Sequence, residues 1–230
     1  MALRTWTGVG FVKRAPTVGG GAVDLRVSSL TPAHARWWHS RVQPIIDQDH
    51  ARADDGWNWM LYVPFTRLTG KLLDRQPMGY AVGLDGLGSG QSAPCAMTLL
   101  LGRSPALDDH GRRSTFTWYL TTAPRRALLE LPEYGLDEAH LPKALGRITL
   151  DVAVTHSLNH RGHGRVGLHA DEEGGDALLD WYLDRGMTIL PKDTSLPPGP
   201  RRFFSPSDGR YCYYTAEAAV AASRSLDNLR

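Results

Sequence analysis

The segment from Gly164 to Pro191 limits the possible folds of this chain more than any other segment. Its sequence, GRVGLHADEEGGDALLDWYLDRGMTILP, predicts a strand, a turn, a helix, a second turn and a second strand. The acidic residues from Asp171 to Glu173 favour a helix start, and Gly186 follows the last helical turn. A unit of this kind must pack on a sheet, so we expect an α/β fold.

The composition is that of a globular protein with one core. At 230 residues, with 42% hydrophobic and 22% charged residues, the chain is long enough for one sizeable domain. Its formal net charge of +2 is too small to indicate a nucleic-acid partner. No apolar run approaches the roughly 20 residues of a membrane helix, so we expect no membrane partner.

Two observations favour a cytoplasmic location. The start of the chain, MALRTWTGVGFVKR, has no apolar block long enough for a secretory signal. Cys95 and Cys212 lie far apart in apolar surroundings, and a pair of buried free thiols fits a reducing compartment.

The N-terminal part predicts an extension followed by a strand and two helices. Residues 1–21 end in three glycines and are expected to be a flexible extension, which leaves 22–230 as one domain. A strand over 22–27 precedes a helix that starts at Thr31 and is broken at Pro44. A second helical pattern follows the turn at Asp54 and Asp55 and runs to Leu72.

The central and C-terminal parts predict a meander and further alternating elements. Strands are expected over 78–84, 95–101 and 114–122, and three strands in succession favour antiparallel pairing. An irregular loop over 123–142 precedes a helix over 143–159 that is apolar around most of its circumference and is therefore buried. After the segment described first, a final hairpin is expected between 202–204 and 211–214, followed by a short helix from Ala216.

In this order of elements the chain resembles the GNAT superfamily of N-acetyltransferases, in a divergent bacterial branch. The similar segments are TWYLTTAP as the fourth strand, KALGRITLDVAVTHSL as the pyrophosphate loop and its helix, and GRVGLHAD as the fifth strand. The resemblance implies a mixed β-sheet, flanked by helices, that splays between those two strands. It also implies acetyl-CoA or another acyl-CoA as co-substrate.

The cofactor site that the resemblance implies lies at the start of the helix over 143–159. A diphosphate needs converging backbone N–H donors, and a helix N-terminus supplies them together with a favourable dipole. Where the superfamily has two spaced glycines, this chain has Ala144 and Gly146, and an alanine there is costly if its backbone is left-handed. The implied cofactor-binding residues are Thr121, Thr122, Lys143, Ala144, Gly146 and Arg147.

Acyl transfer to an amine needs a base for the ammonium group and an acid for the leaving thiolate. Tyr182 lies four residues before Gly186 and matches the tyrosine of the superfamily's tyrosine-to-glycine pattern, so the resemblance implies it as the candidate acid, although a helix tyrosine often only packs. Relatives carry a glutamate where this chain has Thr121, so Glu130 and Glu133 of the following loop are the candidate bases. Loop carboxylates are usually solvated.

The histidines and tryptophans allow further interpretations. His156 and His160 have a spacing that suits a metal, but no acidic partner stands at a ligand spacing, and we expect no metal site. His169, near the end of the fifth strand, is a candidate for substrate binding or proton transfer. The tryptophans of the first helices either fill the core, which we favour, or line an acceptor pocket, where Asp54 and Asp55 would hold an ammonium group.

Three functions are compatible with these residues. The leading hypothesis is an acyl-CoA-dependent N-acyltransferase that acts on a small amine by direct attack. The second is a GNAT-fold protein without transfer activity that binds a ligand or partner, as the missing glycine and Thr121 suggest. The third is a metal-dependent hydrolase that uses the histidine cluster. The sequence leaves the acceptor, the acyl group and the oligomeric state open.

Overall fold

The structure is a computed structural model that describes residues 11–50, 52–84, 93–197 and 206–227. The strands within these residues are β1 (Phe11–Pro16), β2 (Ala22–Ser29), β3 (Gln76–Leu84), β4 (Pro94–Pro105), β5 (Arg113–Thr122), β6 (Val166–His169), β7 (Thr188–Ile189) and β8 (Tyr211–Tyr214). They form one sheet in the order β1-β2-β3-β4-β5-β6-β8-β7. The predicted mixed α/β fold is therefore confirmed.

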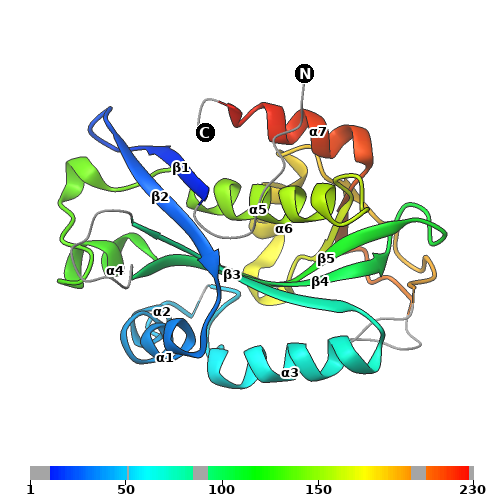
Figure 1. Cartoon of the computed structure of the whole chain (residues 1–230), viewed down its shortest axis with the longest axis horizontal. Coiled ribbons are helices and arrows are strands. Elements are labelled where there is room, and N and C mark those ends of the chain that lie inside the picture. Colours follow the sequence, from blue (N-terminus) through cyan, green and yellow to red (C-terminus); the bar gives the residue numbers. More distant parts are fainter. Residues whose placement is uncertain (1–10, 51, 85–92, 198–205, 228–230) are drawn as a thin grey trace.

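Helices cover both faces of this sheet. The α-helices of the described residues are α1 (Pro32–Arg41), α2 (Gln43–Ile46), α3 (Trp59–Leu72), α4 (Arg125–Glu130), α5 (Leu145–Asn159), α6 (Gly175–Leu183) and α7 (Ala216–Arg224). In Figure 1, α1, α2 and α3 lie on one side of the central strands, and α5 lies on the other. Short 3-10 turns occur at Glu138–His140 and Glu172–Gly174.

Residues 11–21 are part of the fold, which corrects this part of the prediction of a flexible extension over residues 1–21. β1 pairs antiparallel with β2, and Thr17 forms a bridge to Pro142. Lys13 of β1 is buried, and its ammonium group donates a hydrogen bond to the buried carboxylate of Asp151 in α5. The strand was not expected because its apolar and charged residues alternate only briefly before the glycines. Residues 1–10 lie outside the described residues.

Helices α1 and α3 each begin after a capping residue. The Thr31 side chain accepts a hydrogen bond from the His34 backbone, and Asn58 caps α3 in the same way. Pro44 stands in the first turn of α2, so the predicted break falls between α1 and α2. Trp38 and Trp59 from these helices are fully buried, as the core interpretation expected.

The meander from β3 to β5 confirms the antiparallel prediction. The loop over 123–142 is more regular than expected, because it contains α4 and a 3-10 turn. After it, α5 packs across β4 and β5, with Ile148 and Ala153 fully buried. The helix is therefore covered on more than one side, as its apolar circumference predicted.

The last elements close the sheet differently from the predicted hairpin. β8 pairs antiparallel with both β6 and β7 and so lies between them. The other strand of the predicted hairpin, 202–204, lies outside the described residues. The described helices include none that is long and apolar enough to cross a membrane. Cys95 and Cys212 are buried free thiols, and burial raises the pKa of Cys95 to about 12.

Candidate active site

The sheet splays between β5 and β6. These two strands are parallel and pair only from Thr115 to Thr117, opposite Val166 to Leu168, whereas β5 continues to Thr122. A cleft of about 450 Å³ opens where they diverge. Its walls come from β5, β6, α6 and the loop before α3. The lining side chains used below are those of Arg52, Asp54, Trp57, Trp118, Thr121, His169, Trp181 and Tyr182.

Tyr182, the predicted acid, lines this cleft from α6. Its side chain is buried, and burial raises its pKa well above the usual value for tyrosine, with smaller contributions from Cys212 and Asp54. The described residues give its hydroxyl no hydrogen bond. Tyr182 is therefore a protonated hydroxyl at the wall of the cleft, as an acid requires.

A carboxylate stands where the sequence of β5 has none. The Thr121 hydroxyl donates a hydrogen bond to Oδ2 of Asp54, which comes from the loop before α3. Arg52 binds both oxygens of Asp54 at 2.8 Å and also donates to the Thr122 carbonyl at 3.0 Å. Asp54 is buried, so the loop and the end of β5 form one fixed polar unit at the cleft.

His169 also lines the cleft, at the end of β6. Its Nε2 lies 2.8 Å from Oδ2 of Asp208, and its ring lies against Tyr211. Its other nitrogen, Nδ1, is buried and has no hydrogen-bond partner among the described residues. The carboxylate fixes the ring orientation, which suits either binding or proton transfer.

The N-terminus of α5 forms a second hollow of about 410 Å³. The backbone N–H groups of Leu145, Gly146 and Arg147 have no acceptor among the described residues, and no side chain caps this helix. Its N-cap is Ala144, with φ of 63°, in the left-handed region. The alanine therefore occupies the costly conformation that a glycine would take without strain.

Arginines surround this helix start. Arg125, Arg147 and Arg185 line the hollow, and Arg147 has no ion-pair partner among the described residues. Arg125 pairs with Glu138, and Arg185 lies over the Trp181 ring at 3.7 Å. These cations and the free N–H donors suit a diphosphate.

The two hollows adjoin at Trp181. Both are lined by Thr122, Gly146 and Trp181. A Cβ atom added at Gly146 would lie 3.0 Å from the Trp181 ring, so the absence of a side chain lets the indole pack on the helix start. The helix N-terminus therefore opens directly onto the cleft that contains Tyr182.

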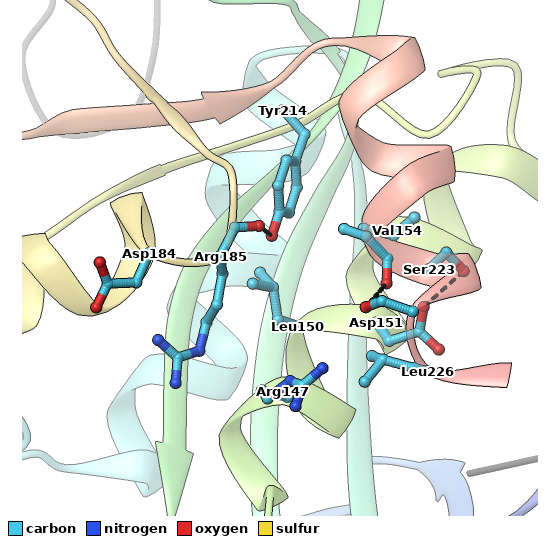
Figure 2. Close-up of a pocket in the computed structure, with 11 residues that line it drawn as sticks. Arg147, Leu150, Asp151, Val154, Asp184, Arg185, Tyr214, Ser223 and Leu226 are labelled. Carbon is cyan, nitrogen blue, oxygen red and sulfur yellow. Dashed lines mark hydrogen bonds between the residues drawn. The ribbon is translucent and has the colours of Figure 1, made fainter. Parts of the chain in front are cut away.

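A third hollow, of about 500 Å³, lies on the other side of the same arginines (Figure 2). Figure 2 shows the guanidinium groups of Arg147 and Arg185 at one end and the Tyr214 ring at the other, with α7 forming one wall. The polar groups deep in this hollow already have partners. The Tyr214 hydroxyl donates to the Arg185 carbonyl at 2.7 Å, and Ser223 donates to Asp151 at 2.8 Å.

Three predicted site residues lie elsewhere. Glu133 binds Arg41 at 2.7 Å, which lowers the pKa of Glu133, and Glu130 pairs with Arg126 on the surface of α4. Neither residue lines the cleft, and both carboxylates are held by arginines outside it. Lys143 is exposed, does not line the hollow at α5, and uses its backbone N–H to bind the Pro16 carbonyl. The structure therefore gives the cleft Asp54 instead of a loop glutamate.

Of the two histidines near the end of α5, His156 belongs to the core and His160 is half-buried at the C-cap. His156 is buried, with Nδ1 2.9 Å from the Tyr80 hydroxyl, and His160 donates from Nδ1 to the His156 carbonyl at 2.8 Å. Within the described ranges, no three His, Cys, Asp or Glu side chains are grouped to hold a metal ion.

Sequence reasoning missed several residues of the site. Asp54 was considered for an ammonium group, but a turn was preferred, and Arg52, Arg185 and Asp208 were not considered. Arg185 stands directly before Gly186, at the predicted end of the helix, where a cation interacts favourably with the helix dipole. This position is the sequence signal that points to Arg185. Nothing in the sequence links Asp54 to Thr121 across 67 positions.

No protein-family model matches the sequence, and no curated protein matches it significantly. Three solved structures to which the chain is similar are acetyltransferases or bind acetyl-CoA or CoA. The spermidine/spermine N-acetyltransferase SpeG from Vibrio cholerae is 14% identical, over 86% of this chain and 98% of that one, with a TM-score of 0.47. RimJ from Mycobacterium smegmatis, in complex with CoA-disulfide, is 13% identical, over 96% and 97%, with a TM-score of 0.44.

The third is the AtaT toxin bound to the C-terminus of the antitoxin AtaR and to acetyl-CoA. It is 11% identical, over 89% of this chain and 96% of that one, with a TM-score of 0.44. The strand pairing itself confirms the mixed sheet, splayed between β5 and β6, that the resemblance to the GNAT superfamily predicted.

Proposed function

We propose that this chain is an acyl-CoA-dependent N-acyltransferase that transfers an acetyl or other acyl group to a small amine by direct attack. The observation that carries this proposal is the junction of the two hollows at Thr122, Gly146 and Trp181. It joins a helix N-terminus suited to a diphosphate to a cleft that contains a protonated tyrosine and a carboxylate.

The residues present fit acyl-CoA in three ways. The unpaired N–H groups from Leu145 to Arg147 and the Arg147 guanidinium would hold the diphosphate. The divergence of β5 and β6 leaves backbone edges beside which an extended chain can lie. The hollow of Figure 2 continues from the same arginines and has room for the nucleotide. Acyl-CoA supplies the thioester on which the amine acts.

The acceptor amine would lie on the Asp54 side of the cleft. Trp57 and Trp118 line this region and favour the apolar part of an amine. The Thr121 hydroxyl donates its hydrogen bond to Asp54. The oxygen of the same hydroxyl can therefore accept a hydrogen bond from an N–H of the substrate. Asp54 then supports the positive charge that develops on the nitrogen, and through Thr121 it provides a route for the proton to leave.

Tyr182 has the second proton-transfer role. In the reaction, a C–N bond forms at the acyl carbon and the C–S bond breaks, and the sulfur leaves as a thiolate that requires a proton. Because burial raises the pKa of Tyr182, its hydroxyl is protonated at neutral pH and donates to that sulfur. Proton transfer to the sulfur leaves Tyr182 as a tyrosinate, which takes a proton from solvent before the next turnover.

Calorimetric titration of the full chain with acetyl-CoA and with CoA tests the proposal. We expect dissociation constants in the micromolar range. In the Arg147→Gln/Arg185→Gln variant, the dissociation constant should rise by about tenfold or more. Arg126→Gln on α4 is the matched control, because Arg126 pairs with Glu130 outside all three hollows, and its affinity should not change. The absence of binding at about 1 mM ligand would reject the proposal.

A panel of small amines, with release of free thiol as the readout, tests transfer itself. The alternative, a GNAT-fold protein that binds a ligand or partner without transfer, is supported by the strained Ala144 and by the absence of a carboxylate on β5. Tight binding of acetyl-CoA without thiol release for any amine would favour this alternative over the enzyme.

A further inference from the structure

A separate group of arginines lines a hollow at the other end of α5. This hollow, about 350 Å³ in volume, lies where the start of β3, the end of β4, the start of β5 and the turn after α5 meet. We call it the arginine hollow, and its lining residues are Asp74, Gln76, Arg103, Arg113, Asn159, His160 and Arg161. The 15 residues of α5 separate it from the helix N-terminus by roughly 22 Å.

The arginines that line the arginine hollow outnumber its carboxylates. Arg103, Arg113 and Arg161 have no ion-pair partner among the residues that the structure describes, and Asp74 is the only carboxylate in the lining. Nearby arginines outside the hollow do have partners: Arg112 pairs with Asp109 and Arg165 with Asp108. The positive charge therefore accumulates in the hollow itself.

A fourth arginine increases this charge. Nη1 of Arg75 donates to the Arg103 carbonyl at 3.1 Å, which holds Arg75 beside the hollow. Burial, and then the nearby charge of Arg113, lower the pKa of Arg75, while Asp74 partly opposes this. The like charges thus repel one another, and an anion between them would relieve the repulsion.

The backbone is strained at the same place. Asp74, Arg103 and Arg161 have φ values of 50°, 59° and 64°, in the left-handed region. Gly102 and Gly162 stand next to the two arginines, yet the arginines adopt this conformation. Strain of this kind persists only where the surroundings impose it, and it is frequent at ligand sites.

The dipole of α5 does not account for the cluster. A cation at a helix C-terminus is favourable, but His160 already donates to the His156 carbonyl in the last turn. Arg103 and Arg113 come from strands, and within the described part of the chain neither side chain forms a hydrogen bond or ion pair with the end of the helix. The convergence of arginines from three elements needs another explanation.

We propose that the arginine hollow binds a phosphate dianion, either free or as a small monoester. One guanidinium group can donate two parallel hydrogen bonds to two phosphate oxygens. Three arginines line this hollow, and Asp74 is the one carboxylate in its lining. The hollow is larger than one phosphate group, and the amides of Gln76 and Asn159 provide neutral hydrogen-bonding groups for the rest of a monoester. This proposal does not depend on the acyltransferase activity.

The test is a nuclear magnetic resonance titration of the full chain with inorganic phosphate and with glycerol 3-phosphate. The titration is carried out on the Arg147→Gln/Arg185→Gln variant, so that phosphate binding in the hollow at the start of α5 does not contribute. We expect amide shifts centred on Gln76, Arg103 and Arg161. Tighter binding of glycerol 3-phosphate identifies a monoester as the ligand, and equal binding identifies free phosphate.

Variants make the test specific. Arg113→Gln combined with Arg161→Asn, in which asparagine tolerates the left-handed backbone, should weaken binding about tenfold or more. Arg112→Gln is the matched control, since Arg112 is adjacent in sequence but pairs with Asp109 outside the hollow. The proposal is overturned if neither probe has shifted these amide resonances when its concentration reaches about 10 mM. It is also overturned if the control substitution weakens binding as much as the double substitution.

Discussion

The carboxylate of Asp54 accepts a hydrogen bond from the hydroxyl of Thr121, across 67 positions of sequence. The loop before α3 thereby brings a negative charge to the end of β5, where the strand itself has only a threonine. Arg52 holds that carboxylate by both oxygens and also binds the Thr122 carbonyl, so the charge is fixed relative to the cleft. A site that looks incomplete along one strand is completed by another element.

Replacing Asp54 should therefore impair transfer more than cofactor binding. Asp54→Asn keeps the shape of the side chain but removes the charge, and we expect kcat/KM for an amine to fall roughly 100-fold. Asp55→Asn is the matched control, because Asp55 lies in the same turn but binds His50 at the surface. Steady-state kinetics and calorimetry with acetyl-CoA separate the two effects. Equal activity of the two variants would contradict a role for Asp54.

Tyr182→Phe should lower kcat by roughly 100-fold with little change in acetyl-CoA affinity, because only the hydroxyl is removed. Since burial raises the pKa of Tyr182, the wild-type rate should show no loss attributable to this tyrosine as the pH rises to about 10. The control is Tyr62→Phe, because Tyr62 stacks on Tyr119 and does not line the cleft. An unchanged kcat for Tyr182→Phe would exclude Tyr182 as the acid.

The sequence predicted the elements that depend on local patterns. The meander, the buried helix α5 and the unit from β6 to β7 follow from periodicity and from capping residues such as Thr31. Tyr182 is a candidate because it matches the tyrosine-to-glycine pattern of the resemblance, on a helix whose position local signals predict. Asp54 and the role of β1 depend instead on contacts between distant segments, such as that between Lys13 and Asp151. No local pattern encodes such contacts, which is why the loop glutamates were chosen instead.

The buried pair of Lys13 and Asp151 provides a test of the N-terminal strand. Lys13→Met leaves the Asp151 carboxylate buried without its cation, so the free energy of unfolding should fall by about 3–5 kcal/mol. Arg14→Met, at the exposed neighbouring position of β1, should have almost no effect. Urea denaturation followed by circular dichroism measures both. A loss below about 1 kcal/mol for Lys13→Met would mean that β1 adds little to the fold.

The left-handed Ala144 predicts a stabilising substitution at the candidate cofactor site. Ala144→Gly removes the clash of Cβ in this conformation, and part of the gain is offset by the greater freedom of glycine in the unfolded chain. We expect the free energy of unfolding to rise by about 0.5 kcal/mol, with unchanged or tighter binding of acetyl-CoA. Ala221→Gly, at an exposed position in the interior of α7, should have the opposite sign, because glycine weakens a helix interior. Thermal denaturation compares the two variants. If Ala144→Gly destabilised the protein, the left-handed backbone at Ala144 would not be a source of strain.

The buried His156 predicts that the protein loses stability in mild acid. Burial, and then the neighbouring His160, lower the pKa of His156 to about 3, whereas an unfolded chain has a histidine pKa of about 6.5. Below pH 6.5 the unfolded state therefore binds more protons than the folded state, and stability falls as the pH decreases toward 3.

From pH 7 to pH 5 this group alone should reduce the free energy of unfolding by about 2 kcal/mol. His156→Gln removes the titrating group, so the variant should lose about that much less over the same interval, even if it is less stable at pH 7. His110→Gln, at an exposed position, should retain the wild-type dependence. Urea denaturation at both pH values provides the measurement. If the His156→Gln protein lost as much stability between them as the wild type, the ring would not be held neutral by its contacts with Tyr80 and His160.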